Sequence, residues 1–228
     1  MKREQADAEM SVPVFLYCNK MSESVDNMVA YRAPRLLMPD GSNADGQRIL
    51  LHSCCAPCSA AIVECMLSNG MRPTVYFSNS NIYPHKEYEI RKSEIIRFLK
   101  EQGVPFVEDS YDHDEWLREV KGYEGEPERG QRCSLCFEFR LRKAADYASE
   151  NGFKWLTTTL ASSRWKNIQQ INEAGIRATV HTQVLFLQQN WRKGGLQERR
   201  NELLRQNAFY NQQYCGCEYS ATRLKDFL

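Results

Sequence analysis

The chain has 228 residues, of which 42% are hydrophobic, so a sizeable core is available and the composition argues against global disorder. Its formal net charge is +1, so contact with a polyanion requires a local basic patch rather than bulk charge. No run of about 18 apolar residues is present, and the first dozen residues lack the apolar core of a signal peptide. We therefore expect a cytoplasmic protein with no membrane partner.

The predicted elements alternate between strands and helices after residue 46. Residues 1–46 have weak periodicity and several turn residues, and we expect an N-terminal extension that packs poorly or variably on a domain formed by residues 47–228. The expected strands lie at 49–51, 74–77, 104–107, 155–160 and within 179–187. The expected helices lie at 60–67, 85–102, 112–120, 135–151, 167–174 and 197–211. This alternation predicts an α/β fold with a parallel sheet and helices on both faces.

The chain has nine cysteines, and in a cytoplasmic protein structural disulfides do not explain so many, because a reducing compartment disfavours them. Clustered thiols in that setting are typical of metal ligands or catalytic groups. Cys18 and Cys65 are isolated, and we expect both to be small apolar residues without chemistry. The other seven form three clusters, namely Cys54, Cys55 and Cys58; Cys133 and Cys136; and Cys215 and Cys217.

The first cluster follows an apolar strand and precedes a helical pattern, so it lies on a predicted strand-to-helix turn. Pro57 suits the first turn of that helix, and Gly70 suits the position just past its end. An open α/β sheet binds its ligands outside the carboxyl ends of the strands. The sequence therefore predicts that the functional site includes this turn.

Cys133 and Cys136 form a C-x-x-C pattern at a predicted helix start, where the helix dipole favours the thiolate. Together with Cys54 and Cys55 they supply four thiolates, which suit either zinc or a [4Fe–4S] cluster. Structural zinc more often uses two similar C-x-x-C knuckles, so the spacing favours the cluster. Cys58 also forms C-x-x-C with Cys55, and spacing alone leaves the ligand set open.

Cys215 and Cys217 are separated only by Gly216. A disulfide between them would close a small, strained ring that is easily reduced and re-formed. Gly216 tolerates the unusual backbone angles that such a ring needs. The pair fits a two-electron store, and the alternative is that one of the two thiols is incidental.

Four motifs in this order resemble those of the cobalamin-independent epoxyqueuosine reductases (QueH family). They are residues 52–59 (HSCCAPCS), 126–137 (EPERGQRCSLCF), 157–163 (TTTLASS) and 214–220 (YCGCEYS). The resemblance covers about residues 50–220 and is carried by no single motif. It implies a Rossmann-like fold of the nucleotide α-hydrolase type. It also implies an oxidoreductase that converts epoxyqueuosine to queuosine at the wobble position of tRNA, the last step of that modification pathway.

The resemblance further implies the site residues. By position in its motifs, the ligands of a [4Fe–4S] cluster are Cys54, Cys55, Cys133 and Cys136, and the redox-active pair is Cys215 and Cys217. An additional iron ion near the cluster is implied as well, but its ligands are not assigned, and Cys58 and nearby acidic residues are candidates. The electron donor is not indicated. In one departure, Leu187-Gln188-Gln189 stands where many relatives have an Asp.

The reaction itself needs more than a cluster. Opening an epoxide to an alkene takes two electrons and releases the oxygen as water, with help from a proton donor or a Lewis-acidic metal. Glu126, Glu128, Arg132 and Tyr83 lie near the motifs in sequence and are candidate site groups. The alternative for each is a loop salt bridge or a helix cap.

Binding of tRNA is expected at a local basic stretch. Residues 190–205 carry a net charge of +3, whereas residues 108–128 carry −7, and either stretch is alternatively a solvated face. We expect residues 191–205 to contact tRNA phosphates through Arg192, Lys193, Arg199 and Arg200. Trp165 and Trp191 either stack on bases or pack in the core.

Two other classes of function are open to the same sequence. An ATP-using tRNA enzyme of the same fold group needs a glycine-rich phosphate turn after the first strand, and residues 53–57 contain no glycine, so no ATP is expected. The other alternative is a non-enzymatic zinc-binding module. Colour distinguishes the two metals, because a zinc protein is colourless and an iron–sulfur protein purified without oxygen is brown.

Overall fold

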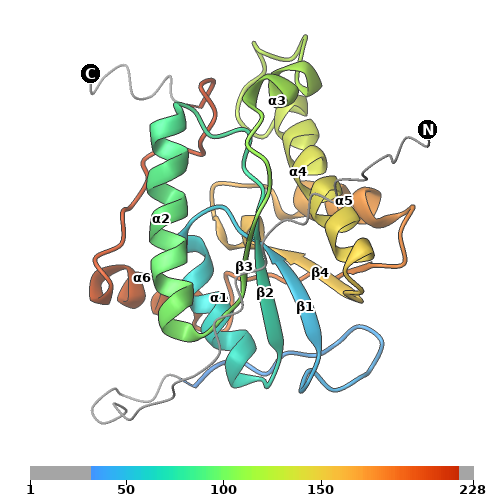
Figure 1. The fold of residues 1–228 in the computed structure, drawn as a ribbon, viewed down its shortest axis with the longest axis vertical. Helices are drawn as coiled ribbons and strands as arrows, with labels where there is room; N and C mark the ends of the chain where they lie inside the picture. The colour runs from blue at the N-terminus through green and yellow to red at the C-terminus, as the bar shows by residue number, and fades with distance from the viewer. Residues whose placement is uncertain (1–31, 221–228) are drawn as a thin grey trace, which may run out of the picture.

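The computed structural model describes residues 32–220, so Cys18 and the rest of residues 1–31 lie outside the described part (Figure 1). Its strands form one five-stranded sheet in which every pairing is parallel and the order is β3-β2-β1-β4-β5. The strands are β1 (Arg48–His52), β2 (Arg72–Phe77), β3 (Phe106–Glu108), β4 (Trp155–Thr158) and β5 (Leu185–Phe186). This order is Rossmann-like, as the sequence predicted.

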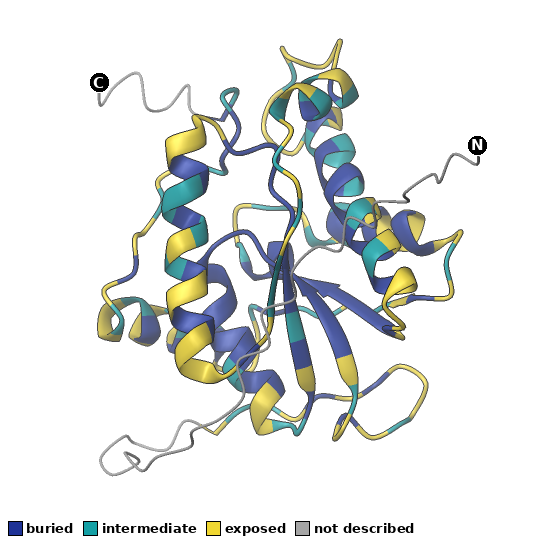
Figure 2. Cartoon of the chain, in the orientation of Figure 1, coloured by how far each residue is buried: buried dark blue, intermediate teal, exposed yellow. Residues whose placement is uncertain are grey.

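Helices cover both faces of the sheet, with α1, α2 and α6 on one face and α3, α4 and α5 on the other (Figure 1). They are α1 (Ala56–Ser68), α2 (His85–Gln102), α3 (His113–Glu119), α4 (Gln131–Glu150), α5 (Ile168–Thr179) and α6 (Leu196–Gln206), with a short 3-10 helix, η1 (Thr159–Ser162), after β4. The central strands β1, β2 and β4 are largely buried between the two layers of helices, whereas the edge strands β3 and β5 are partly exposed (Figure 2). Among the described helices, none combines the length and the hydropathy that a membrane span requires.

All the predicted strands and helices are present, but several of their boundaries differ, and helix α6 ends at residue 206 rather than at 211. Helix α2 spans the predicted residues and ends at Gly103, whose φ of 65° lies in the left-handed region. Helix α4 begins four residues before the predicted start, so Cys133 and Cys136 lie within its first two turns. Strand β4 ends early because the Thr158 side chain accepts a hydrogen bond from the Leu160 N–H and starts η1. The predicted fifth strand is short because α5 continues to residue 179.

The described part of the N-terminal extension packs on the domain, which corrects the expectation of poor packing for residues 32–46. Leu36 and Met38 are each 5% exposed and belong to the main hydrophobic core. The Leu36 N–H donates to Asn69 Oδ1 at 2.9 Å, and Asn69 Nδ2 donates to the Pro34 carbonyl at 3.0 Å. These contacts fasten the segment to the end of α1. The division of the chain at residue 46 stays a prediction.

The chain reverses its direction of winding between β1 and β4. From β1 it crosses through α1 to β2, and from β3 it returns through α4 on the opposite face to β4. The connections therefore diverge outside the carboxyl ends of β1 and β4, where α/β sheets of this kind form a crevice. The turn at residues 53–55 and the helix η1 both lie at this point.

Candidate active site, a thiol-lined cavity

A cavity of about 540 Å³ lies at the carboxyl edge of the sheet and is lined by cysteines from all three clusters. These are Cys54, Cys58, Cys133, Cys136, Cys215 and Cys217. All eight cysteines of the described residues are free thiols. Segments far apart in the sequence thus bring their thiols to one cavity, and Cys65, which is buried elsewhere beneath Pro34, is not among them.

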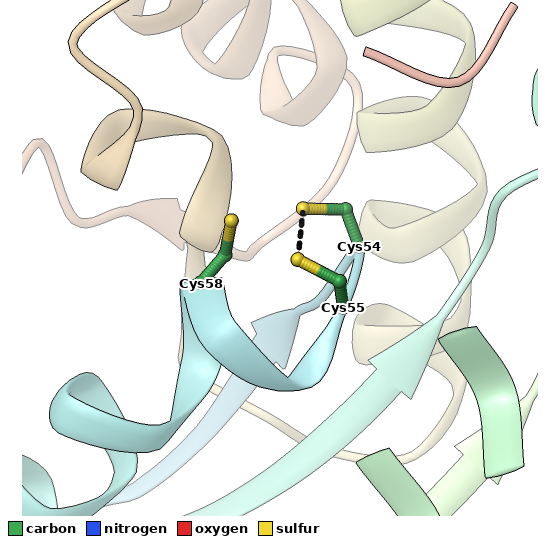
Figure 3. A group of neighbouring side chains, drawn as sticks. All are labelled: Cys54, Cys55 and Cys58. Atoms are coloured by element: carbon green, nitrogen blue, oxygen red, sulfur yellow. Dashed lines mark hydrogen bonds between the residues drawn. The ribbon is translucent and has the colours of Figure 1, made fainter. Parts of the chain in front are cut away.

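Cys54, Cys55 and Cys58 form the tightest group of thiols, with all three Sγ atoms within 4.8 Å of one another (Figure 3). The Cys54 and Cys55 sulfurs are 3.8 Å apart, and Gln212 Nε2 donates to Cys55 Sγ at 2.9 Å. Cys55 precedes α1, and Cys58 follows Pro57 in its first turn, so the turn aims the three side chains together. In the sequence, the C-x-x-C spacing of Cys55 and Cys58 indicated that Cys58 belongs to this group of thiols.

The pKa values of the three thiols are shifted in opposite directions. Hydrogen bonds from the Cys55 and Cys58 thiols hold the pKa of Cys54 well below its usual range, and the charges of Lys166 and Arg140 add to this. Burial raises the pKa of Cys55 well above the ordinary value. The interaction with Cys54 raises the pKa of Cys58 to about 11. Cys54 is therefore the most acidic thiol of the group.

Cys133 and Cys136 reach the same cavity from α4. The Arg129 N–H donates to Cys133 Sγ at 3.3 Å, from a backbone with φ of 70° that is uncommon for a residue with a side chain. Burial raises the pKa of Cys136 to about 11. Neither sulfur belongs to the group within 4.8 Å, so among the described residues these two thiols line the cavity apart from Cys54.

The Cys215–Cys217 segment is held in place by buried polar contacts. Arg91 Nη1 donates to the Cys215 carbonyl at 3.0 Å, and the Tyr83 N–H donates to the Gly216 carbonyl at 2.8 Å. Gly216 has a φ of 139°, so the expectation of unusual backbone angles is confirmed. Cys215 is half-buried and Cys217 is buried, and burial raises the pKa of Cys217 to about 11.

A buried histidine ties three strands together beneath the thiols. His52 Nε2–H donates to the Ser78 carbonyl at 3.1 Å, and His52 Nδ1 accepts from the Thr158 hydroxyl at 2.8 Å. Burial and the nearby Arg140 charge lower the pKa of His52 to about 3, so the ring is neutral. In the sequence, His52 stands out only as the first residue of the 52–59 motif. Its position at the end of a buried apolar strand was the available signal for this bracing role.

The candidate groups of the 126–132 loop have mainly structural roles. Glu126 Oε2 accepts from the Gln131 N–H at 3.0 Å, and buried Arg132 donates to the Glu124 and Glu126 carbonyls. Glu128 lines the cavity. Tyr83 is not among the residues described as lining it, and its ring stacks on His113 with centroids 5.1 Å apart.

The expected basic surface at residues 191–205 is wrong for Arg199, and of the two alternatives for Trp191 the structure shows packing in the core. Trp191 is 1% exposed and packs in the core, which leaves Trp165, 63% exposed, as the candidate for stacking. Arg199 is buried and pairs with Glu64 at 2.7 Å and with Glu202 at 3.0 Å. Arg200 lines the cavity. A short basic sequence on a helix places its cations on different faces, which net charge alone does not reveal.

Comparison with known proteins gives the family. The sequence profile described as epoxyqueuosine reductase QueH matches residues 49–223. The epoxyqueuosine reductase QueH of Histophilus somni is 46% identical over 202 residues, covering 88% of this chain and 82% of that protein. The proteins of the same name from Acinetobacter baylyi and Haemophilus influenzae are 48% and 49% identical, covering 82% of this chain in each case and 85% and 75% of their own lengths. With a cysteine-lined cavity at the carboxyl edge of a Rossmann-like sheet, the chain belongs to the epoxyqueuosine reductase QueH family.

Proposed function

We propose that this chain reduces epoxyqueuosine to queuosine at the wobble position of tRNA and that the thiol-lined cavity is the place of the reduction. The observation that carries the proposal is the meeting of three cysteine clusters, from segments about 80 residues apart in sequence, at the switch point of the sheet. Family membership supplies the substrate, because the relatives are named for the reduction of epoxyqueuosine.

The donor set fits an iron–sulfur cluster. The metal-ligating candidates that line the cavity are thiols, apart from the carboxylate of Glu128, and soft thiolate ligands favour iron–sulfur clusters or zinc over hard cations. We propose that a [4Fe–4S] cluster is held by Cys54 and Cys55 from the turn after β1 and by Cys133 and Cys136 from α4. A bound cluster would pass electrons one at a time to the substrate. Cys58 is the thiol nearest to Cys54 and Cys55 for the additional iron ion.

Cys215 and Cys217 supply the second requirement, a store of two electrons. Conversion of the epoxide to the alkene consumes two electrons and two protons and releases one water molecule. Oxidation of two thiols to a disulfide releases two electrons and two protons, so the two half-reactions balance. An external two-electron reductant then restores the dithiol. The raised pKa of Cys217 supports this role, because the residue enters the cycle as a protonated thiol.

Lys166 supplies a fixed positive charge in the cavity. Burial disfavours its charged form, but the neighbouring cysteines Cys215, Cys54 and Cys58 outweigh burial and raise the pKa of Lys166. In turn, the ammonium charge lowers the pKa of Cys54. It also favours the approach of an anionic substrate.

Anaerobic purification followed by an assay on tRNA tests the function. The protein should be brown, contain iron and acid-labile sulfide, and convert epoxyqueuosine to queuosine in tRNA, as measured by mass spectrometry of the digested nucleosides. A colourless, zinc-containing protein that converts no epoxyqueuosine would support the zinc-binding module instead.

A further inference from the structure

We propose that four residues at the mouth of the cavity, Arg129, Arg164, Trp165 and Arg200, bind the single-stranded RNA on either side of the modified nucleotide. We call these four residues the cationic rim. The inference rests on the proposed function for the identity of the RNA. Of the basic stretch 191–205 it keeps Arg200, and it adds residues from two other segments of the chain.

The cavity concentrates positive charge in a protein that is nearly neutral overall. Six cations line it, against a single carboxylate, Glu128, among the described lining residues. The six are Arg91, Arg129, Arg132, Arg164, Lys166 and Arg200. The net charge of the whole chain is only +1, so this density is local. A cleft lined by one sign of charge attracts a ligand of the opposite sign, here a polyanion.

The contacts of these cations separate the internal ones from those that can meet a ligand. Arg91 and Arg132 are buried. Arg91 pairs with Glu87 and donates to the backbone carbonyls of Tyr214 and Cys215, and Arg132 donates to backbone carbonyls of its own loop. Arg129 and Arg164 are exposed, and Arg200 is half-buried. Within residues 32–220, none of the three rim arginines forms an ion pair with a carboxylate, unlike Arg199 on the same helix as Arg200. Their charges are therefore available to phosphates.

Trp165 is the exception among the tryptophans. The other three are at most 1% exposed, whereas Trp165 is 63% exposed at the mouth of a polar cavity. Arg129 Nε donates to the Trp165 carbonyl at 2.6 Å, and the Arg164 guanidinium lies 5.3 Å from the centre of the Trp165 ring. The backbone of the loop is thus fixed while the indole stays open. Exposed aromatic rings beside cations are typical of proteins that stack single-stranded bases.

The geometry suits an unpaired loop rather than a duplex. A base that is reduced inside a cavity has to leave its stack, and sequence-tolerant RNA binding places the neighbouring bases on aromatic rings. Stacking of one neighbouring base on Trp165 replaces the stacking that the modified base gives up. The rim arginines hold the phosphates on both sides, so the rim positions the nucleotide over the thiols.

The test measures RNA binding without requiring turnover. The probe is a fluorescein-labelled stem–loop RNA of the anticodon arm, and its anisotropy is followed with the full-length protein at several salt concentrations. Trp165→Ala should raise Kd roughly 5- to 150-fold, the range for loss of one base–aromatic stack, and Trp165→Phe should restore most of the affinity. The triple variant R129Q/R164Q/R200Q should lower the salt slope by about 2, since each single-strand phosphate contact contributes about 0.7.

Arg72→Gln is the matched control, because Arg72 is exposed at the amino end of β2, on the opposite edge of the sheet. It should leave both Kd and the salt slope unchanged. Wild-type affinity and slope in the rim variants, or no binding by the wild-type protein, would overturn the inference. If the wild-type protein binds RNA through the rim but converts no epoxyqueuosine, the proposed function is wrong and the rim proposal stands. If the wild-type protein converts epoxyqueuosine and the rim variants bind RNA normally, the rim proposal is wrong and the proposed function stands.

Discussion

Replacing Gly216 with alanine should destabilise the fold through the segment that carries Cys215 and Cys217. The Gly216 backbone has a φ of 139°, and a side chain in such a conformation costs about 1–3 kcal/mol. A Cβ atom built there would lie 3.0 Å from Ile82 Cγ1 and 3.2 Å from Asn81 Nδ2, so neighbouring atoms must shift. Crowding of this kind adds about 1–3 kcal/mol. We expect Gly216→Ala to lower the free energy of unfolding by about 2–6 kcal/mol.

Differential scanning calorimetry measures the effect, which corresponds to a fall in Tm of roughly 4–24 °C for a chain of this size. The control is Gly122→Ala, because Gly122 has a φ of 89° and a Cβ there meets nothing within 4 Å. That variant carries the backbone cost without the crowding, and its Tm should fall by less. Equal losses of Tm in the two variants would refute the argument that Ile82 and Asn81 confine the segment.

Three further predictions concern the core and the corrected surface. Leu36→Ala should lower the free energy of unfolding, measured with urea, by about 2–4 kcal/mol, because Leu36 is 5% exposed. The control Leu37→Ala, at a residue that is 73% exposed, should change it by less than about 0.5 kcal/mol. Equal effects of the two variants would contradict the packing of the extension. Trp191→Ala should cost about 3–5 kcal/mol, and a thermal melt like that of the wild type would show that this ring is not in the core. Arg199→Met should lower the free energy of unfolding by about 1–3 kcal/mol, because it leaves Glu64 without its partner. It should not change the salt dependence of RNA binding. A weaker salt dependence would show that Arg199 contacts RNA.

Local signals predicted most of the fold. The apolar strands and Gly70 placed α1, and Gly103 closes α2 in the left-handed conformation that favours glycine. The clustered thiols were found by spacing and motif resemblance, and the cavity contains members of all three clusters. These features succeed because each depends on neighbours in the sequence.

The errors concern interactions between residues far apart in the chain. The sequence predicts Arg199 to be a surface cation, because its partner Glu64 lies 135 residues away in the chain. The structural role of His52 depends on its hydrogen bond with Thr158, which is 106 residues away in the sequence. Burial of Leu36 depends on the end of α1, which receives the segment only in the folded chain. Periodicity and composition carry no information on such pairs. The cationic rim could not be predicted from the sequence for the same reason, because its residues come from three separate segments.

The iron and acid-labile sulfide content of two variants tests the central claim most directly, namely that one set of cysteines holds the cluster and another stores the electrons. After anaerobic purification, Cys54→Ser should have lost most of its iron and sulfide. The double variant C215S/C217S should keep the wild-type content while losing multiple-turnover reduction of epoxyqueuosine in tRNA. A full complement of iron and sulfide in Cys54→Ser, or a double variant that loses the cluster as completely, would contradict this division of roles.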